Sequence, residues 1–154
     1  MPDVKELLIR SKLFEGARNI VINTLLERAV TVHFASGEIP VAETTVTDRI
    51  LMVFEGEVQL EVALQSAEQE VKLFRAGPGT FLGLVNFFEV VAQPMTAAAL
   101  TEVKAVAWKA EDWHRICDEN PAFGWRLSQR IGRELVERMS IWVNQLLNAV
   151  NWVA

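Results

Sequence analysis

Few side chains in this sequence are suited to catalysis or metal binding. His33 and His114 fall in different predicted elements, whereas a metal site needs clustered His, Cys, Asp or Glu ligands. The only cysteine, Cys117, lies in an apolar helical context that is typical of a packed thiol. Ser128 has no convincing histidine or acid partner to activate it as a nucleophile. We therefore predict no catalytic residue, no metal, no cofactor and no enzymatic activity. The alternatives are haem ligation by the histidines, a reactive or haem-binding Cys117, and a jelly-roll metalloenzyme of the cupin type.

Composition and charge restrict the classes of partner. The chain has 154 residues, 51% of them hydrophobic, which suits a single domain with one core. The net charge of −5 and the pI near 5.1 argue against direct nucleic-acid binding, which normally requires a basic patch. No apolar run reaches the roughly 18 residues of a membrane span, and the N-terminal segment lacks the pattern of a signal peptide. We expect a cytoplasmic protein that does not contact membranes.

The predicted secondary structure, which must position any site, changes twice along the chain, from helices to strands and back to helices. Apolar residues at helical spacing predict helices at 4–10 and 17–27. Short apolar or alternating segments separated by turn signals then predict strands, and residues 65–69 fit a hairpin loop; the strands are expected at 30–34, 49–53, 57–62, 71–74, 96–100 and 103–108. Many short strands of this kind indicate a mainly β fold, an antiparallel barrel or jelly roll with flanking helices.

The C-terminal part is predicted to be helical again. A short helix is expected at 112–117, and Asn120-Pro121 predicts the start of a long one, with asparagine as N-cap and proline at the first helical position. We therefore expect a single domain over 1–154, with N-terminal helices in 1–29, the jelly roll in 30–110 and C-terminal helices in 111–154. No helix-turn-helix follows, so we expect either the sensor half of a longer regulator or a stand-alone module.

An apolar stripe along the last helix predicts a packing surface. Residues 140–154 carry no charge, and such a helix would be an aggregation hazard if left exposed. We predict a homodimer through this helix, and the alternative is a helix that packs only on its own domain. The residues expected at the dimer contact are Leu127, Ile131, Leu135, Trp142 and Leu146.

Six groups of residues follow one another in an order and spacing that match a known family. They are residues 13–14, 34–39, 50–58, 74–83, 96–100 and 120–128, and they include Gly37, Gly56, Gly79 and Gly83. Together they resemble the cyclic-nucleotide-binding domain family, in particular the sensor half of the catabolite-activator regulators. The resemblance implies a β jelly roll, a regulatory ligand-sensing function and a long helix that pairs with its twin and covers the ligand.

The resemblance also implies where a ligand would bind. In this family a glycine turn and a short helix, the phosphate-binding cassette, supply backbone N–H groups to a cyclic phosphate. One arginine also holds the phosphate, and a glutamate holds the ribose hydroxyl. Carried over to this chain, the cassette residues are Phe81, Leu82, Gly83, Leu84, Val85, Met95, Thr96 and Ala97. The residues that would cap the ligand from the last helix are Arg138 and Met139.

Two positions of this cassette depart from the family pattern. Leu84 stands where the ribose glutamate is expected, and Met95 stands where the phosphate arginine is expected. Residues 76–103 contain no Lys or Arg, and Glu89 would replace the missing acid only if the cassette helix were rotated. Losing two charge-assisted hydrogen bonds costs roughly 3–6 kcal/mol, or about 10²- to 10⁴-fold in affinity. We therefore predict weak or no binding of cyclic AMP.

The expected pocket wall is apolar and suits an apolar or aromatic ligand better than an anion. Its residues are Leu82, Leu84, Val85, Phe87, Phe88 and Met95. Two alternatives remain open: these side chains could fill the pocket so that nothing binds, or a cyclic nucleotide could be held in a non-standard way. The expected partners are thus a small apolar or nucleotide-like ligand, a second copy of the chain and possible partner proteins.

Overall fold

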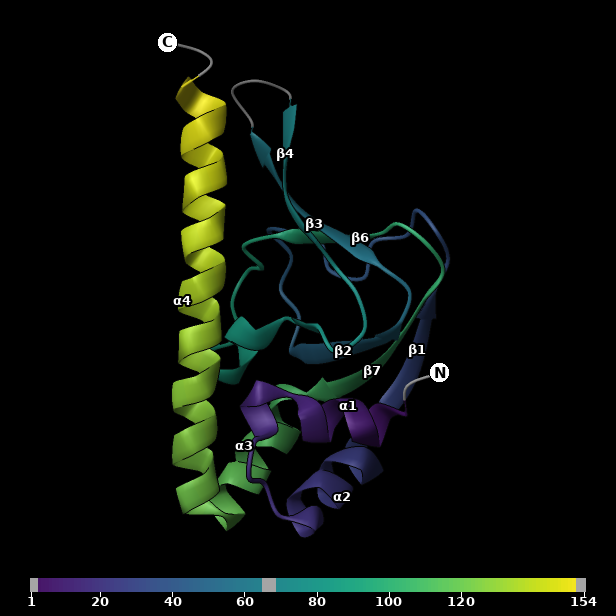
Figure 1. Ribbon diagram of the computed structural model, residues 1–154, viewed down its shortest axis with the longest axis vertical. Helices are drawn as coiled ribbons and strands as arrows, with labels where there is room; N and C mark the ends of the chain where they lie inside the picture. The colour runs from purple at the N-terminus through teal and green to yellow at the C-terminus, as the bar shows by residue number, and fades with distance from the viewer. Residues whose placement is uncertain (1–2, 65–68, 152–154) are drawn as a thin grey trace.

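The computed structural model describes residues 3–64 and 69–151 and places seven strands in two antiparallel sheets (Figure 1). The larger sheet has the strand order β1-β7-β2-β5, and the smaller one has the order β4-β3-β6. The strands are β1 (Val30–Phe34), β2 (Arg49–Glu55), β3 (Val58–Leu64), β4 (Gln69–Ala76), β5 (Phe81–Leu82), β6 (Thr96–Ala99) and β7 (Val103–Lys109). The predicted fold class is confirmed: an antiparallel jelly roll with helices before its first strand and after its last strand. The predicted loop at 65–69 falls mostly outside the described residues.

Strand β2 separates two hydrophobic cores because its side chains alternate between the two faces of the larger sheet. Ile50 and Met52 are buried with the helices in what we call the helical core. Leu51 and Val53 are buried between the sheets in what we call the inter-sheet core. Both faces of β2 are therefore covered, which explains why this strand reads as a continuous apolar run instead of an alternating one.

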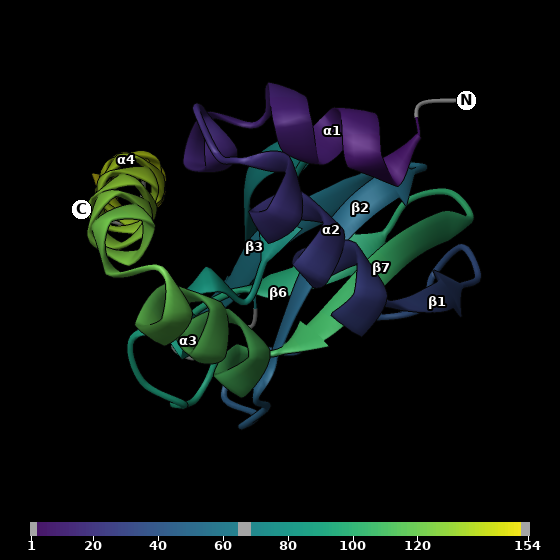
Figure 2. The same cartoon turned by 90° about the horizontal axis from the view of Figure 1, so that it is seen from below.

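Helices cover the outer face of the larger sheet. Figure 2 shows α1 (Val4–Arg10), α2 (Asn19–Arg28) and α3 (Ala110–Glu119) packed over β2 and β7. A 3-10 turn, η1 (Lys12–Phe14), links the first two helices. The buried Trp108 indole of β7 donates a hydrogen bond of 2.7 Å to the carbonyl oxygen of Leu25, which ties α2 to the sheet.

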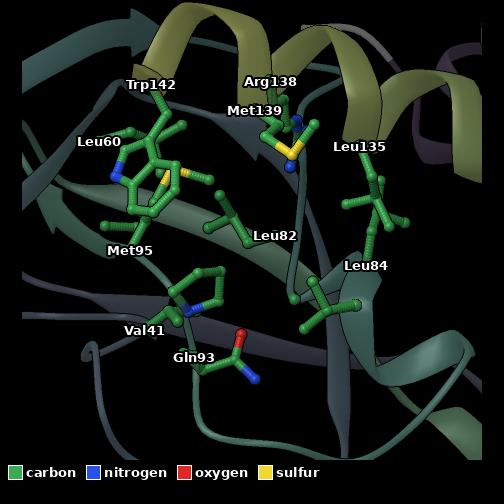
Figure 3. A pocket seen from close by; sticks show the side chains of 14 residues that line it. Val41, Leu60, Leu82, Leu84, Gln93, Met95, Leu135, Arg138, Met139 and Trp142 are labelled. Atoms are coloured by element: carbon green, nitrogen blue, oxygen red, sulfur yellow. The ribbon is translucent and has the colours of Figure 1, made fainter. Parts of the chain in front are cut away.

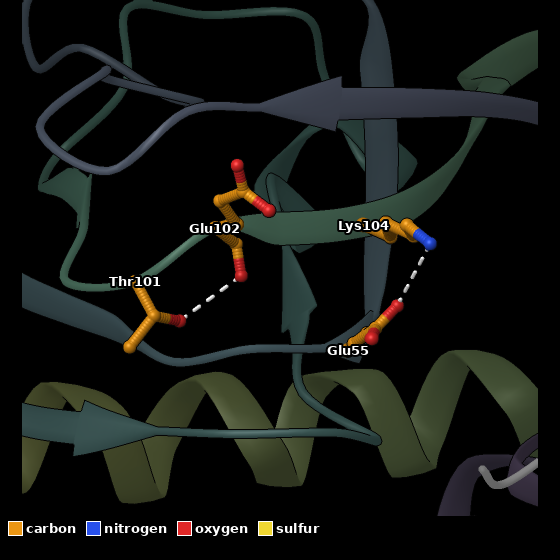
Figure 4. Close-up of polar contacts among 4 residues, drawn as sticks. All are labelled: Glu55, Thr101, Glu102 and Lys104. Carbon is orange, nitrogen blue, oxygen red and sulfur yellow. Dashed lines mark hydrogen bonds and ion pairs between the residues drawn. The ribbon is translucent and has the colours of Figure 1, made fainter.

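The turn from β2 into β3 joins the two sheets and requires glycine. Gly56 has φ +92°, and a Cβ at this position would lie 2.1 Å from the carbonyl oxygen of Glu102. The Thr101 hydroxyl donates to that same carbonyl at 3.0 Å (Figure 4). Beside the turn, Lys104 and Glu55 form a half-exposed ion pair at 3.2 Å, which contributes at most about 1 kcal/mol. Close backbone packing, more than this ion pair, fixes the turn.

Helix α4 (Pro121–Asn151) begins where the sequence predicts, but Asn120 has a different role from the one expected. The Asn120 side chain donates to the carbonyl oxygen of Ile116 at 3.1 Å and accepts from Arg18 at 3.1 Å. It therefore completes the end of α3 instead of capping the start of α4. The reason is that one residue joins the two helices, and its backbone geometry (φ −134°, ψ 73°) ends α3.

Of the five residues of α4 predicted at the dimer contact, two are buried in their own domain and three pack on it only in part, so the contact of those three with a second copy stays a prediction. Leu127 and Ile131 are fully buried in the helical core, and Leu135 packs against that core. Trp142 and Leu146 pack against the inter-sheet core. Helix α4 runs along the side of the barrel (Figure 1), so the barrel itself covers the most apolar face of the helix. Residues 152–154 of the predicted C-terminal helices lie outside the described residues.

Candidate functional site

A cavity of about 260 Å³ lies between the barrel and α4 (Figure 3). Its wall combines the cassette, the loop before β6, strand β3 and one face of α4. Apart from Gln93 and Arg138, the lining side chains are apolar or aromatic. The lining residues are Val41, Leu60, Leu82, Gly83, Leu84, Val85, Gln93, Pro94, Met95, Ala97, Leu135, Arg138, Met139 and Trp142.

Gly83 places the cassette against the larger sheet. Its φ is +77°, and a Cβ there would lie 2.6 Å from the carbonyl oxygen of Arg49. The short helix that follows, η2 (Leu84–Phe87), is held by the fully buried Asn86, whose amide donates to the same Arg49 carbonyl at 2.9 Å. The Gln93 amide donates to Asn86 Oδ1 at 3.1 Å. The cassette therefore keeps the family's glycine turn and is anchored by neutral amides.

The structure does not bring all the predicted residues to the cavity. Leu82, Gly83, Leu84, Val85, Met95 and Ala97 line it. Phe81 points the other way into the helical core, because neighbouring residues of β5 face opposite sides of the sheet. Thr96 does not line the cavity; its hydroxyl accepts a hydrogen bond of 2.9 Å from the backbone N–H of Glu43 and so braces the loop that contains Val41.

Phe87 and Phe88 were expected in the pocket wall, and the structure places both elsewhere. Phe87 is buried in the helical core, where its ring packs against Trp113, and its carbonyl oxygen contacts His114 Nε2. Phe88 is 54% exposed. The turn of η2 directs the Phe87 ring toward α3, whereas the Phe88 ring lies beside Gly132 of α4. His114 thereby connects the cassette to α3.

Leu84 and Met95, the two departures from the family pattern, both line the cavity. Leu84 is fully buried, and Met95 packs against the inter-sheet core. Figure 3 shows Leu84 facing Leu135 of α4 and Met95 lying beside Trp142. The two positions that were expected to carry an acid and an arginine therefore offer hydrocarbon and a thioether.

One positive side chain does reach the cavity, although none is present in the cassette segment. Arg138 of α4 lines the cavity and is only 8% exposed. Its Nε donates to Glu134 Oε1 at 3.2 Å. Burial lowers the pKa of the Arg138 guanidinium, while the adjacent Glu134 raises it and favours the charged form. Residues 76–103 contain no Lys or Arg, but the cavity as a whole does contain a cation, because α4 supplies Arg138.

Sequence reasoning missed several lining residues. Leu60 occupies an inward position in the alternating strand β3, and the alternation at 57–62 could have identified it. Val41, Gln93 and Pro94 come from irregular loops, where no periodicity indicates which side chains point inward. Gln93 is 4% exposed, and a buried polar residue in a loop has no signature in a single sequence.

The residues considered for other chemistry do not form a second site. Cys117 is half-buried, and desolvation raises the pKa of its thiol to about 11, with a smaller contribution from Asp118. Within residues 3–64 and 69–151, no three His, Cys, Asp or Glu side chains gather as a metal site would require. Over the same residues, no helix combines the length and apolar character needed to cross a membrane.

Known proteins resemble this chain in fold. A cyclic nucleotide-binding domain from Methylobacillus flagellatus superposes with a TM-score of 0.78 over 95% of this chain and 82% of its own, at 15% identity. The N-terminal domain of a transcriptional regulator from Streptomyces coelicolor gives a TM-score of 0.73 over 87% and 92%, at 26% identity. The sensor domain of a transcriptional regulator from Pseudomonas aeruginosa gives 0.73 over 88% and 91%, at 17% identity.

The sequence comparisons agree with the fold. A CRP-like cAMP-activated global transcriptional regulator from Mycobacterium tuberculosis is 23% identical over 145 residues, which cover 94% of this chain and 62% of that protein. This chain thus spans less than two thirds of the length of the curated relatives it matches. The family model of the cyclic nucleotide-binding domain matches residues 31–120, which is more than half of the chain. The chain therefore belongs to the cyclic nucleotide-binding domain family.

Proposed function

We propose that this chain is a non-catalytic sensing domain whose cavity accepts an apolar ligand and binds cyclic AMP weakly or not at all. The observation that carries the proposal is the pair Leu84 and Met95, which face the cavity where the family pattern expects a glutamate and an arginine. We also propose that the protein acts in the cytoplasm and does not bind nucleic acid directly; the net charge of −5 supports the second point.

Electrostatics supports weak binding of a cyclic phosphate. The cassette contributes no cation, and the single cation of the cavity, Arg138, already contacts Glu134. Glu134 offsets part of the Arg138 charge, so a cyclic phosphate would lose its water against one partly compensated cation and without the partner that its ribose needs. The ribose hydroxyl would face Leu84, which can accept no hydrogen bond. The two missing contacts together weaken binding by about 10²- to 10⁴-fold.

The cavity is not filled by its own side chains, which favours a ligand over a self-filled pocket. Its volume of about 260 Å³ lies just below the range of about 300–1,000 Å³ that is usual for small-molecule sites. A wall of this composition with a few convergent polar groups is also typical of such sites. Ligand sensing is therefore preferred over a role in which the pocket is filled by its own side chains.

The position of α4 supports a regulatory mechanism. Four side chains of this helix form part of the cavity wall: Leu135, Arg138, Met139 and Trp142. A ligand that contacts them binds the barrel and the helix together, so it stabilises the arrangement of α4 in which these contacts are made. Occupancy of the cavity and the position of α4 are thereby linked, and α4 can transmit the signal.

Titration calorimetry with cyclic AMP and cyclic GMP tests this proposal. We expect no micromolar binding to the natural chain. The double variant Leu84→Glu with Met95→Arg should gain about 10²-fold or more in affinity for cyclic AMP, because it restores both charge-assisted contacts. The matched control is Leu84→Gln with Met95→Gln, which is polar but uncharged and should gain little. Micromolar binding of either nucleotide by the natural chain would refute the proposal.

A second function is favoured by a different observation. Helix α4 carries an exposed apolar stripe formed by Trp125, Val136, Met139, Val143 and Leu147. From Gly132 onward they follow at intervals of three or four, and Trp125 stands seven residues before it, as in a coiled-coil seam. Val136, Val143 and Leu147 lie on a different face from the residues buried against the barrel, and Met139, which also lines the cavity, lies at the edge between the two faces. We propose that this exposed stripe pairs with a second copy of the chain, so that the domain is also a dimerisation module.

A further inference from the structure

Arg138 is buried with part of its hydrogen-bonding capacity unused. The residue is 8% exposed, and its Nε contacts Glu134. Among the residues that the structure describes, neither Nη1 nor Nη2 of Arg138 has a hydrogen-bond partner or a second ion pair. A guanidinium has five donors in a planar fork, and its two terminal nitrogens match the two oxygens of a carboxylate. Such a fork offers free donors to an anionic ligand.

Glu134 leaves the cavity side of Arg138 free. A neighbouring groove of about 390 Å³ is lined by Glu134, with Lys12 and Arg75, and shares only Arg138 with the cavity. Glu134 does not line the cavity. The contact between Arg138 and Glu134 therefore belongs to the groove side, while Arg138 also forms part of the cavity wall. Figure 3 shows Arg138 and Met139 side by side below α4, facing the cavity.

Apart from Arg138, the cavity has few polar side-chain groups: the Gln93 amide and the Trp142 indole N–H, which is buried without a hydrogen-bond partner among the described residues. The Gln93 amide nitrogen is already engaged with Asn86 Oδ1 and the carbonyl oxygen of Val91. Its amide oxygen, which Figure 3 shows turned toward the middle of the cavity, is an acceptor and would repel an anion. Leu60, Leu82 and Met95 present only apolar atoms. A fitting ligand thus has one small anionic group at Arg138 and an apolar body.

We propose that the cavity binds an apolar monocarboxylic acid, with its carboxylate on the Arg138 Nη groups and its hydrocarbon body among Leu60, Leu82 and Met95. This proposal rests on the proposed function of the cavity as a ligand site. A carboxylate is satisfied by one guanidinium through two parallel hydrogen bonds. A cyclic nucleotide has further polar groups, on ribose and base, for which this wall has few partners. The single cation and the apolar wall therefore select a carboxylate with a hydrocarbon tail.

The test compares three ligands of the same chain length and different charge. Octanoate, 1-octanol and octylammonium are titrated into the natural chain by calorimetry, below the concentrations at which they form micelles. Octanoate should bind at least about 10-fold more tightly than octanol, because a charge-assisted pair contributes about this much or more. Octylammonium should bind most weakly, because its charge repels Arg138. The variant Ala97→Leu, which fills the cavity, should lose all binding and so locates the site.

Two variants of α4 separate charge from packing. Arg138→Gln should weaken octanoate binding by about 10- to 100-fold and leave octanol binding within about 3-fold. Glu134→Gln keeps an acceptor for Arg138 Nε but removes the competing charge, so it should strengthen octanoate binding by about 3- to 10-fold. A purely structural role of Arg138 would change the binding of both ligands equally, or of neither.

The outcomes distinguish this proposal from the one on which it rests. Equal affinities for octanoate and octanol, or octanoate binding that is unaffected by Arg138→Gln, would refute the carboxylate while leaving an apolar ligand site. If no ligand binds the natural chain, both the carboxylic acid and the cavity as an apolar site are refuted. Glutamine has nearly the same shape as glutamate, so Glu134→Gln changes the charge without changing the packing. Its effect on octanoate binding therefore tests the proposal even if Arg138→Gln lowers stability.

Discussion

At Gly83 the backbone reaches a conformation and a proximity that only glycine allows. Its φ of +77° costs an L-residue about 1–2 kcal/mol, and an added Cβ would also lie 2.6 Å from the Arg49 carbonyl oxygen. We expect Gly83→Ala to lower the free energy of unfolding by about 3 kcal/mol, because strain and clash add. The measurement is urea denaturation followed by circular dichroism.

Gly16 provides the matched control for this prediction. It has the same φ of +77°, but no heavy atom lies within 4 Å of the position that a Cβ would occupy. Gly16→Ala should therefore cost only about 1 kcal/mol, since it introduces strain without a clash. Equal costs at the two glycines would show that the approach to Arg49 does not constrain the cassette.

Single residues also show what a sequence can and cannot indicate about this cavity. The family pattern located Leu82, Leu84 and Met95 because these residues lie at fixed offsets from Gly83 in a continuous segment. The same pattern gave Arg138 only as a cap position. That Arg138 lines the same cavity as Leu84 depends on how α4 packs on the barrel, which no local spacing records.

At the scale of elements, α4 carries two apolar stripes with different partners. The stripe containing Leu127 and Ile131 is buried in its own domain, whereas the stripe containing Val136 and Leu147 is exposed, each of the latter two at 56%. Periodicity alone predicted a broad apolar face but could not assign its two parts, because both have helical spacing. Only the direction in which α4 leaves α3 decides which stripe meets the barrel.

This assignment makes dimerisation testable on the exposed stripe. Val143→Glu should weaken self-association by at least about 100-fold, because each of the two copies loses a buried valine side chain of roughly 1.5 kcal/mol or more. The control is Asn148→Glu, which adds the same charge at an exposed position away from the stripe. Sedimentation velocity over a range of concentrations gives the association constants, and dimerisation that persists in Val143→Glu would exclude this stripe.

At the scale of the whole molecule, the two cores are joined by elements that belong to both. Strand β2 contributes Ile50 and Met52 to the helical core and Leu51 and Val53 to the inter-sheet core. Helix α4 passes from Ile131 in the first core to side chains packed on the second. The unbroken apolar run of β2 fits burial on both faces, but such a short run does not by itself distinguish a buried strand from a buried helix segment. That the N-terminal helices and α3 pack on the same face of the larger sheet could not be predicted from the sequence and is known only from the tertiary structure.

Because each core shares its strands with the other, neither can unfold alone. We expect a single unfolding transition in urea, with the same midpoint by far-ultraviolet circular dichroism and by tryptophan fluorescence. Ile131→Ala in the helical core and Val53→Ala in the inter-sheet core, both at fully buried positions, should each shift the entire transition, the first by about 2–5 kcal/mol. Performing the experiment in the Val143→Glu background removes the contribution of dimerisation. Two separate midpoints, or a shift of only one signal in either variant, would show that the helices and the barrel are independent units and would remove the basis for coupling a ligand in the cavity to α4.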